Sequence, residues 1–312
     1  MAENIIKSGF AAILGLPNAG KSTFINAIVG EKVAIVSPKP QTTRNNIIGI
    51  YNGGSCQIVF TDTPGIQTPR TKLGGFMAKS VENAKSGVDC VIYVAAANKK
   101  KATIDDREAG AITKIVKSKT PAILALNKTD VLTKAEILPE IAKYKDFGFA
   151  EIVPLSALKG ENVSELIEIV KKYIPDGPAY YPDDIATDQP ERALIAEIIR
   201  ERALYILQDE IPHGVAVVVQ SVKYRKKTGP AGAANETVID IEADIFCEKD
   251  SHKGIIIGKD GSALKKIGQT ARPSIEALLG GKVNLQLWVK VKKDWRDNDF
   301  LLNSFGYSTK KQ

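Results

Sequence analysis

The sequence predicts two domains, an α/β domain with a mostly parallel sheet and helices on both faces, followed by an α+β domain. From Phe10 to Tyr173, short apolar runs alternate with amphipathic stretches, and such strand–helix alternation favours a parallel sheet. A segment rich in Pro, Gly and Asp then precedes a different order of a helix, two strands, helices and a final strand. The length of 312 residues also suits about two domains.

The expected strands of the first domain are short and apolar, at 10–14, 47–51, 57–60, 90–95, 122–126 and 152–155. In the second domain we expect a helix at 191–207 and strands at 215–222, 238–246 and 283–291. The basic, Gly-rich run from Tyr224 to Pro230 is expected to be a mobile hairpin connection. The expected domain boundaries are 1–175, a linker at 176–189, 190–300, and a C-terminal tail at 301–312.

The composition, with 44% hydrophobic and 25% charged residues, is that of a soluble globular protein. The net charge of +7 permits a polyanionic partner without requiring one, and residues 222–293 concentrate it with 14 basic against 8 acidic side chains. Three scattered cysteines and two isolated histidines predict neither disulfides nor a zinc site. Without a secretory signal or a membrane-length apolar run, the expected location is cytoplasmic.

A phosphate-binding pattern, G-x-x-x-x-G-K-[ST], occupies Gly15 to Ser22. It lies between an apolar strand and a helix expected to begin near Lys21, so backbone N–H groups and the helix N-terminus can surround phosphates. Lys21 is expected to neutralise the β- and γ-phosphates, and the Ser22 hydroxyl to ligate Mg²⁺. The expected phosphate-binding residues are Gly15, Pro17, Asn18, Ala19, Gly20, Lys21, Ser22 and Thr23.

A second motif, Asp62-Thr63-Pro64-Gly65, follows the strand expected at 57–60. Asp62 is therefore expected to project toward Mg²⁺, and the Gly65 N–H toward the γ-phosphate. In the loop before 47–51, a hydroxyl can close over the metal and the γ-phosphate, and we favour Thr43 over Thr42 for this role.

Two further motifs follow the next strands and predict recognition of guanine. In Asn127-Lys128-Thr129-Asp130, Asp130 can accept hydrogen bonds from guanine N1–H and its exocyclic amine, a donor pair that adenine lacks. Asn127 is expected to complement the other edge of the base, and the Lys128 stem to cover the ring. In Ser156-Ala157-Leu158, a backbone N–H can reach guanine O6. The four ordered motifs predict GTP and GDP as ligands, with Mg²⁺.

Hydrolysis of GTP is expected to rest on Lys21, Thr43 and Gly65, and to be slow without assistance. Ile66 follows the second motif, at the position of a water-orienting glutamine in many GTPases, and cannot perform that task. Asn18 is similar to the asparagine with which potassium-stimulated GTPases ligate K⁺ in place of an arginine finger. The alternative is that Asn18 is only a turn residue.

In the second domain, the stretch from His252 to Ser262 contains I-I-G-x-x-G, the arrangement of KH domains, whose glycine loop clamps about four single-stranded nucleotides. Asp260 departs from the basic or neutral pair of residues usual in that loop.

Pro273 predicts a kink or a new start in the helix that follows the loop. Trp288 lies in a strand of alternating polarity and is expected in the core. The expected RNA-binding residues are Ile257, Gly258, Lys259, Gly261, Lys265 and Lys266, with a solvated helix face as the alternative for the lysines.

From Phe10 to Tyr307 the chain resembles the Era family of GTPases, in which a GTPase domain precedes a KH domain. Besides the guanine motifs, the resemblance rests on Gln41-Thr42-Thr43-Arg44, on 287–292 closing on Trp295, and on Ser304-Phe305-Gly306-Tyr307. It implies a switch protein that binds the 3′ end of small-subunit (16S) ribosomal RNA and assists maturation of the small ribosomal subunit. We expect a monomer without a DNA partner.

Two other functional classes remain open. In one, a signalling GTPase docks its basic domain on anionic lipid at the inner face of the cell membrane, although no amphipathic basic helix or lipidation motif supports this. In the other, suggested by Ile66, a nucleotide-binding adaptor has no useful hydrolysis, and its turnover is indifferent to K⁺ and RNA.

Overall fold

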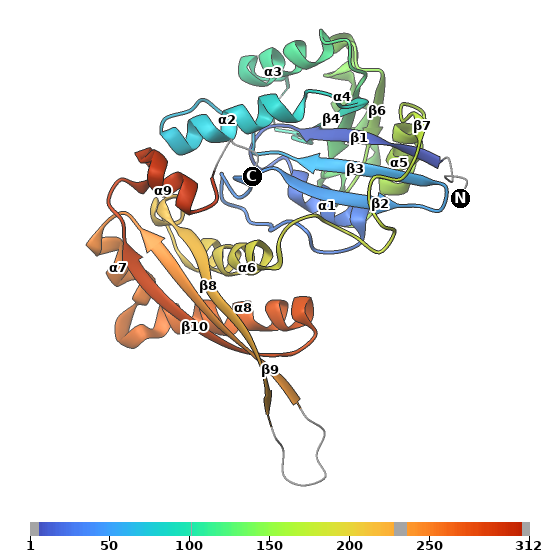
Figure 1. The fold of residues 1–312 in the computed structure, drawn as a ribbon. Coiled ribbons are helices and arrows are strands. Elements are labelled where there is room, and N and C mark those ends of the chain that lie inside the picture. Colours follow the sequence, from blue (N-terminus) through green and yellow to red (C-terminus); the bar gives the residue numbers. More distant parts are fainter. Residues whose placement is uncertain (1–5, 101, 228–235, 308–312) are drawn as a thin grey trace. The chain divides into compact units, whose positions relative to one another are not determined.

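The structure is a computed structural model that describes residues 6–100, 102–227 and 236–307 (Figure 1). It contains two compact units, the first comprising most residues up to Asp188 and the second comprising the chain from Gln189 together with the short segments Ser37–Thr42 and Thr71–Leu73. The first unit consists of β1 (Ile6–Leu14), α1 (Lys21–Val29), β2 (Ile47–Asn52), β3 (Cys56–Asp62), α2 (Lys72–Ala84), β4 (Cys90–Ala96), α3 (Asp106–Val116), β5 (Ala122–Asn127), η1 (Thr129–Val131), α4 (Lys134–Ala142), η2 (Lys145–Phe147), β6 (Glu151–Pro154), α5 (Val163–Lys171) and β7 (Asp176–Gly177).

The sheet of the first unit has the strand order β2-β3-β1-β4-β5-β6, with the short β7 paired to the start of β1. The pairs β3–β1, β1–β4, β4–β5 and β5–β6 are parallel, whereas β2 and β7 are antiparallel to their neighbours. The expected mostly parallel sheet is therefore confirmed. Because parallel strands end at one edge, the loops after β1, β3, β5 and β6 gather there.

Each face of this sheet carries its own core. Phe24 and Ile28 of α1 and Leu166 of α5 belong to one buried cluster, and Val81 of α2 and Ile112 of α3 to the other. Helices therefore cover both faces, as Figure 1 shows. The strands between them are buried on both sides, which explains their continuous apolar runs.

The segment expected to be a linker at 176–189 is instead part of the first unit as far as Asp188. Asp176 and Gly177 pair with β1, and the Gln57 side-chain oxygen accepts the Tyr180 and Tyr181 N–H groups at 2.7 and 2.9 Å. Further along, the Ile50 N–H donates to the Ala186 carbonyl at 2.8 Å. Proline and glycine stop regular structure here, but backbone hydrogen bonds still fix the segment.

The main helices and strands of the second unit follow one another in the order α-β-β-α-α-β. Its elements are α6 (Glu191–Ile206), η3 (Ile211–Gly214), β8 (Ala216–Lys227), β9 (Glu236–Cys247), α7 (Asp250–Ile257), η4 (Lys259–Gly261), α8 (Ser262–Leu279), β10 (Lys282–Val291), η5 (Trp295–Asp297) and α9 (Asp299–Ser304). The sheet order is β10-β9-β8, with β8–β9 antiparallel and β9–β10 parallel. One face of this sheet packs on α6, α7 and α8. This is the α+β domain that the sequence predicts.

Trp288 is not in the core as expected, because 44% of it is exposed. The odd-numbered residues of β10, such as Val283 and Val289, pack into the core under the helices. Since side chains alternate along a strand, the even-numbered Trp288 lies on the opposite face of the sheet. Trp295, by contrast, is fully buried, and its indole N–H donates to the Gly214 carbonyl at 2.9 Å.

Three other expectations concern the later part of the chain. The helix α8 runs through Pro273 as one element, so a new helix start at this residue is wrong. The expected tail at 301–312 is not separate, since Phe305 stacks on Phe246 and Tyr307 on Trp295. The expected hairpin connection from Tyr224 to Pro230 is only partly described. Its residues up to Lys227 belong to β8, Thr228 to Pro230 lie outside the described residues, and β9 begins at Glu236. Residues 308–312 of the expected tail also lie outside them.

Candidate nucleotide and RNA sites

The phosphate loop joins β1 to α1 through a tight backbone path that requires glycine at two positions. A Cβ on Gly15 would lie 2.3 Å from the Val94 carbonyl oxygen, and one on Gly20 would lie 2.4 Å from Asn127 Nδ2. Gly20 also has φ of 94° directly before the helix, and Asn18 has φ of 62°. The loop therefore brings successive N–H groups toward the helix N-terminus, an arrangement that suits phosphate oxygens.

Lys21, the first residue of α1, is buried beneath this loop. Its ammonium donates to the Gly15 and Leu16 carbonyls at 3.2 and 3.1 Å. Burial lowers the pKa of Lys21 from 10.5 to about 8, although the Asp62 carboxylate acts in the opposite direction. A phosphate would provide the anion that this desolvated ammonium requires.

Ser22, Thr43 and Asp62 meet beside the phosphate loop, although they come from α1, the loop before β2 and the end of β3. The Asp62 Oδ2 accepts the Ser22 and Thr43 hydroxyls at 2.9 and 3.2 Å, and the two hydroxyl oxygens are 2.7 Å apart. Thr42 is directed elsewhere, because its hydroxyl bonds Ser37 and the Lys39 carbonyl. The geometry thus places Thr43, rather than Thr42, at this position.

The residues of this cluster fit Mg²⁺, a hard cation that prefers oxygen ligands. Asp62 is fully buried, and its Oδ1 has no hydrogen-bond partner among the described residues. Burial raises the pKa of Asp62 from 3.8 to about 6, while Lys21 and the Ser22 hydroxyl oppose the shift. A buried carboxylate with an unused oxygen beside two hydroxyls suits a divalent cation.

Replacement of Asp62 by Asn is expected to stabilise the nucleotide-free chain at pH 8 and to lose this advantage at lower pH. An acid whose folded pKa is about 6 and whose ordinary value is 3.8 binds its proton more tightly when folded. The wild type therefore gains stability as the pH falls from about 7 to 4, by up to ~3 kcal/mol for this group alone. Melting curves of both proteins between pH 4 and 8, with EDTA, measure the difference.

Asp146→Asn, at an exposed position in η2, is the matched control and is expected to alter the melting temperature little at any pH. A stability gain for Asp62→Asn that stayed constant from pH 8 to 4 would contradict the assignment to this ionisation. In the same variant, Mg²⁺ should no longer increase GTP affinity, because a neutral amide replaces the carboxylate.

Gly65 and Ile66 lie directly against the phosphate loop. A Cβ on Gly65 would approach the Pro17 backbone nitrogen to 2.7 Å, so this contact requires glycine. The Ile66 N–H donates to the Gly15 carbonyl at 3.0 Å, and Arg107 of α3 donates to the Ile66 carbonyl at 2.8 Å. The apolar Ile66 side chain packs against the core under α2 and α3, where it cannot orient water.

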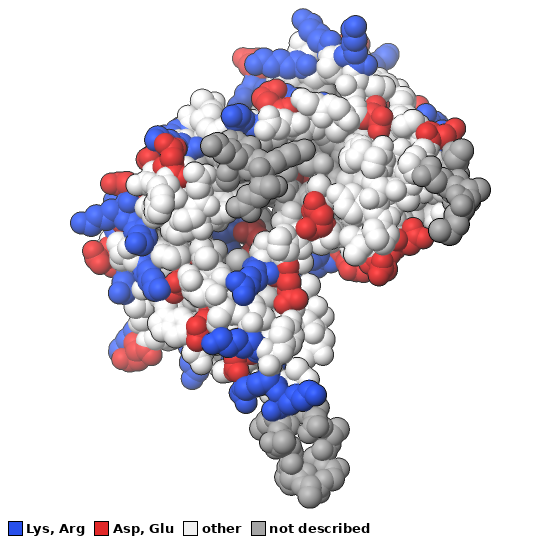
Figure 2. Space-filling model, viewed as in Figure 1, with Lys and Arg blue, Asp and Glu red and all other residues white. Residues whose placement is uncertain are grey.

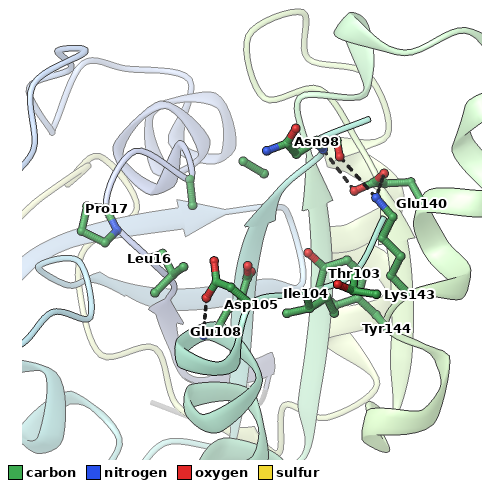
Figure 3. Close-up of a pocket in the computed structure, with 12 residues that line it drawn as sticks. Leu16, Pro17, Asn98, Thr103, Ile104, Asp105, Glu108, Glu140, Lys143 and Tyr144 are labelled. Atoms are coloured by element: carbon green, nitrogen blue, oxygen red, sulfur yellow. Dashed lines mark hydrogen bonds and ion pairs between the residues drawn. The ribbon is translucent and has the colours of Figure 1, made fainter. Parts of the chain in front are cut away.

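A small pocket of about 150 Å³ adjoins the other side of the phosphate loop (Figure 3). Several of its polar lining residues bond to protein groups: Glu140 accepts the Asn98 N–H at 3.1 Å and pairs with Lys143 at 2.5 Å. The Asp105 side chain caps α3 by accepting the Glu108 N–H at 2.9 Å. None of the residues expected to recognise guanine lines this pocket.

Asn127, the last residue of β5, connects three loops. Its Nδ2 donates to the Ala19 carbonyl at 3.0 Å, and its Oδ1 accepts the Lys128 and Ala157 N–H groups at 2.8 and 3.0 Å. Only 2% of the residue is exposed. This amide therefore holds the phosphate loop and the loop after β6 together, and its expected contact with the base stays a prediction.

The other residues expected to recognise guanine lie around Asn127. Lys128, at φ of 65°, extends to the Asn18 carbonyl at 2.6 Å, and burial lowers its pKa, with Asp130 acting in the opposite direction. Asp130 lies in η1, and its Oδ1 accepts the Ser156 hydroxyl at 2.6 Å. Leu158 is 78% exposed, and the expected contact of its loop with the base is through a backbone N–H.

The glycine loop of the second unit joins α7 to α8. Ile257 ends α7, Gly258 has φ of 76°, and a Cβ on it would lie 2.8 Å from the Ala263 N and Cβ atoms. Lys259 to Gly261 form a single turn, in which Asp260 has φ of 52°. Lys259, Lys265 and Lys266 are all exposed beside the loop.

A groove of about 360 Å³ runs from this loop between α8 and β10. Of the expected RNA-binding residues, Gly261 and Lys265 line it, whereas Ile257, Gly258, Lys259 and Lys266 do not. The remaining lining residues were missed in the sequence: Leu264, Gly268, Gln269, Arg272, Leu285 and Leu287. For those in α8, the helical spacing of three and four residues from Gly261 could have identified them, because it places them on one face of the helix.

Family models match both units. A model described as "50S ribosome-binding GTPase" matches residues 10–128, and one described as "KH domain" matches residues 210–296. Among residues 6–100, 102–227 and 236–307, no helix is both long and apolar enough to cross a membrane.

The fold and the two sites define a P-loop GTPase that carries a KH domain. The chain is 50% identical over 308 residues to "GTPase Era" of Clostridioides difficile (strain 630), a match covering 98% of this chain and 100% of that protein. The chain therefore belongs to the Era family of GTPases. "GTPase Era" of Clostridium beijerinckii is 48% identical, covering 97% of this chain and 98% of the relative.

Two solved structures are similar along nearly the whole chain. Era of Aquifex aeolicus, a single-substitution variant bound to GDP and AlF4⁻, is 37% identical with a TM-score of 0.89, covering 97% of this chain and 100% of that one. An Era structure in complex with MgGDPNP and nucleotides 1506–1542 of 16S ribosomal RNA has the same identity and TM-score, covering 97% and 99%.

Proposed function

We propose that this GTPase binds the 3′ end of 16S ribosomal RNA in the groove beside Gly258 and assists biogenesis of the small ribosomal subunit. The observation that carries the proposal is the groove between α8 and β10, which begins at the glycine loop of the KH domain. The solved relative bound to nucleotides 1506–1542 of 16S ribosomal RNA supports this choice of RNA.

The lining of the groove suits single-stranded RNA. Leu264, Leu285 and Leu287 offer an apolar surface to the faces of unstacked bases, while Gln269 and Arg272 can donate hydrogen bonds to base edges. Lys265 lies on the same side of α8 and can neutralise a phosphate. The expected backbone clamp is the turn from Gly258 to Gly261, and the Asp260 carboxylate must then point away from the phosphates.

In the GTPase domain, we propose that the residues gathered at the strand ends hold GTP with Mg²⁺. Ser22, Thr43 and Asp62 would hold the metal, which neutralises charge developing on the β- and γ-phosphates. Lys21 would stabilise the γ-phosphate from beneath the loop, and the Gly65 N–H would orient it. No side chain is assigned as a general base, so we expect hydrolysis to be slow without assistance.

The coupling between the two sites is tested by RNA binding in different nucleotide states. A labelled oligonucleotide matching the 16S 3′ end is expected to bind more tightly than a scrambled sequence, and its affinity is expected to differ between GDP and a non-hydrolysable GTP analogue. A salt series separates specific from electrostatic binding. Equal, salt-sensitive binding of both RNAs in both states would leave a GTPase with a basic surface and would favour the membrane or adaptor alternatives.

We further propose that Asn18 ligates K⁺ during hydrolysis. The side chain of Asn18 is exposed at φ of 62°, a conformation that asparagine and glycine both tolerate. Asn18→Gly therefore keeps the turn and removes only the amide. This variant is expected to lose most of the stimulation of kcat by K⁺ over Na⁺, at least about tenfold, equivalent to ~1.4 kcal/mol in the barrier.

Asn18→Asp is the companion variant, because a carboxylate can still ligate a monovalent cation. Single-turnover hydrolysis in KCl and in NaCl measures the effect, and GTP affinity serves as the control. If Asn18→Gly were stimulated by K⁺ as strongly as the wild type, Asn18 would be only a turn residue.

A further inference from the structure

The far end of α3 in the GTPase domain presents three lysines that form no ion pair with the described residues. Lys114 lies in the last turn of the helix, Lys117 caps it, and Lys119 follows two residues later. All three are exposed, and no carboxylate in the described part of the chain lies within 4.0 Å of their ammonium groups. Figure 2 shows Lys and Arg side chains, together with Asp and Glu, in the region of α3.

Some lysines on other helices of this domain are paired, whereas Lys79, Lys134 and Lys172 form no ion pair with the described residues either, so the α3 lysines differ by lying within six residues of one another. Lys85, Lys143 and Lys171 each pair with a glutamate three residues earlier, at 2.8, 2.5 and 2.6 Å. The corresponding positions before Lys114 and Lys117 are Ala111 and Lys114, so neither lysine has an acid one turn away. One cation near a helix C-terminus is favourable, but further unpaired like charges repel.

The turn that carries these lysines is well fixed. The Ser118 hydroxyl donates to the Ile115 carbonyl at 2.7 Å, and the Lys117 N–H donates to the Thr113 carbonyl at 3.2 Å. No large apolar or aromatic side chain is exposed between residues 106 and 120. The surface therefore offers positive charge on a fixed backbone turn, without an apolar wedge for a membrane or a ring for stacking on bases.

We propose that Lys114, Lys117 and Lys119, the α3 lysine patch, contact backbone phosphates of double-stranded RNA. Duplex RNA presents phosphates at high density, and its bases are stacked inside, so a surface with charge alone suits it. The identity of the polyanion rests on the proposed function, since RNA is already the proposed partner of the KH groove. The patch adds a second, sequence-independent contact made by the GTPase domain.

The test uses the full chain with GDP and a labelled RNA duplex of about 16 base pairs with an unrelated sequence. Lys114→Gln, Lys117→Gln and Lys119→Gln combined should weaken duplex binding about tenfold and reduce the slope of log affinity against log salt by about two to three. The control combines Lys79→Gln, Lys134→Gln and Lys172→Gln, three exposed lysines elsewhere in the domain with the same change in charge. It should change affinity less than about twofold.

Equal losses in both triple variants would overturn the proposal, because net charge alone would then explain binding. Loss of binding to phosphatidylglycerol–phosphatidylcholine vesicles, with duplex binding intact, would assign the patch to a membrane instead. Binding of the single-stranded 16S 3′ end is measured in the same preparations and should not change. If the wild type failed to bind that strand, the proposed function would fail independently of the patch.

Discussion

Asp130→Asn is expected to reverse the base preference of the nucleotide site, from GTP to xanthosine triphosphate. The Asp130 carboxylate accepts the Ser156 hydroxyl through Oδ1 and keeps lone pairs for two donors of guanine. An amide would oppose one of these donors with its own N–H, while the additional carbonyl of xanthine accepts that N–H. The expected loss of GTP affinity is about 10³-fold or more, because the buried polar groups of the site remain unpaired.

Competition between GTP and xanthosine triphosphate for the same labelled nucleotide measures this change. Ser156→Ala is the companion variant, since it removes the hydroxyl that orients Asp130 but keeps the carboxylate. It is expected to weaken GTP by roughly tenfold, without changing the preferred base. An unchanged preference for guanine in Asp130→Asn would show that another group recognises the base.

Gly258→Asp is expected to abolish binding of the 16S 3′ end and to leave GTP affinity intact. Gly258 has φ of 76°, and any Cβ there would lie 2.8 Å from the Ala263 backbone nitrogen. The substitution therefore distorts the start of the turn that should clamp the RNA backbone, and it also adds a negative charge beside phosphates. We expect affinity to fall by at least about 100-fold, equivalent to ~2.7 kcal/mol.

Gly280→Asp is the matched control in the same domain. Gly280 also has positive φ, at 64°, but a Cβ there would meet no atom within 4 Å, and the residue ends α8 away from the glycine loop. It should bear a similar backbone strain and charge while retaining RNA binding. RNA affinity of Gly258→Asp equal to that of this control would remove the clamp from the proposed function, whereas a shared loss of the folded state would appear in both melting curves.

The sequence predicts the nucleotide site better than it predicts the surroundings of individual residues. The phosphate loop, Asp62 and Asp130 could be placed because each follows an apolar strand, and parallel strands end at one edge of the sheet. The partner of the Asn127 amide could not be predicted, since it lies 108 positions earlier at Ala19 and depends on how two loops approach. Motif spacing identifies the residues of a site but not which of them touch one another.

In the KH domain, alternation along β10 predicted a strand but not which face is covered. Val283 and Val289 already mark the apolar face, so the opposite parity of Trp288 could have been recognised. The segment 176–188 is a different case, because its proline and glycine content correctly indicates the absence of long regular elements. Its attachment to β1 and to Gln57 depends on tertiary hydrogen bonds that composition does not contain.

The hydrogen bonds of Asn127 join the loop expected to bind phosphate to the loop expected to recognise the base. One amide holds Ala19 of the phosphate loop on one side and Ala157 of the guanine loop on the other. We therefore expect a change at this position to lower the affinity for any nucleotide, whatever its base. A substitution of Asp130 is expected to change which base the domain prefers. Asn127, by contrast, supports the loops that any nucleotide would contact.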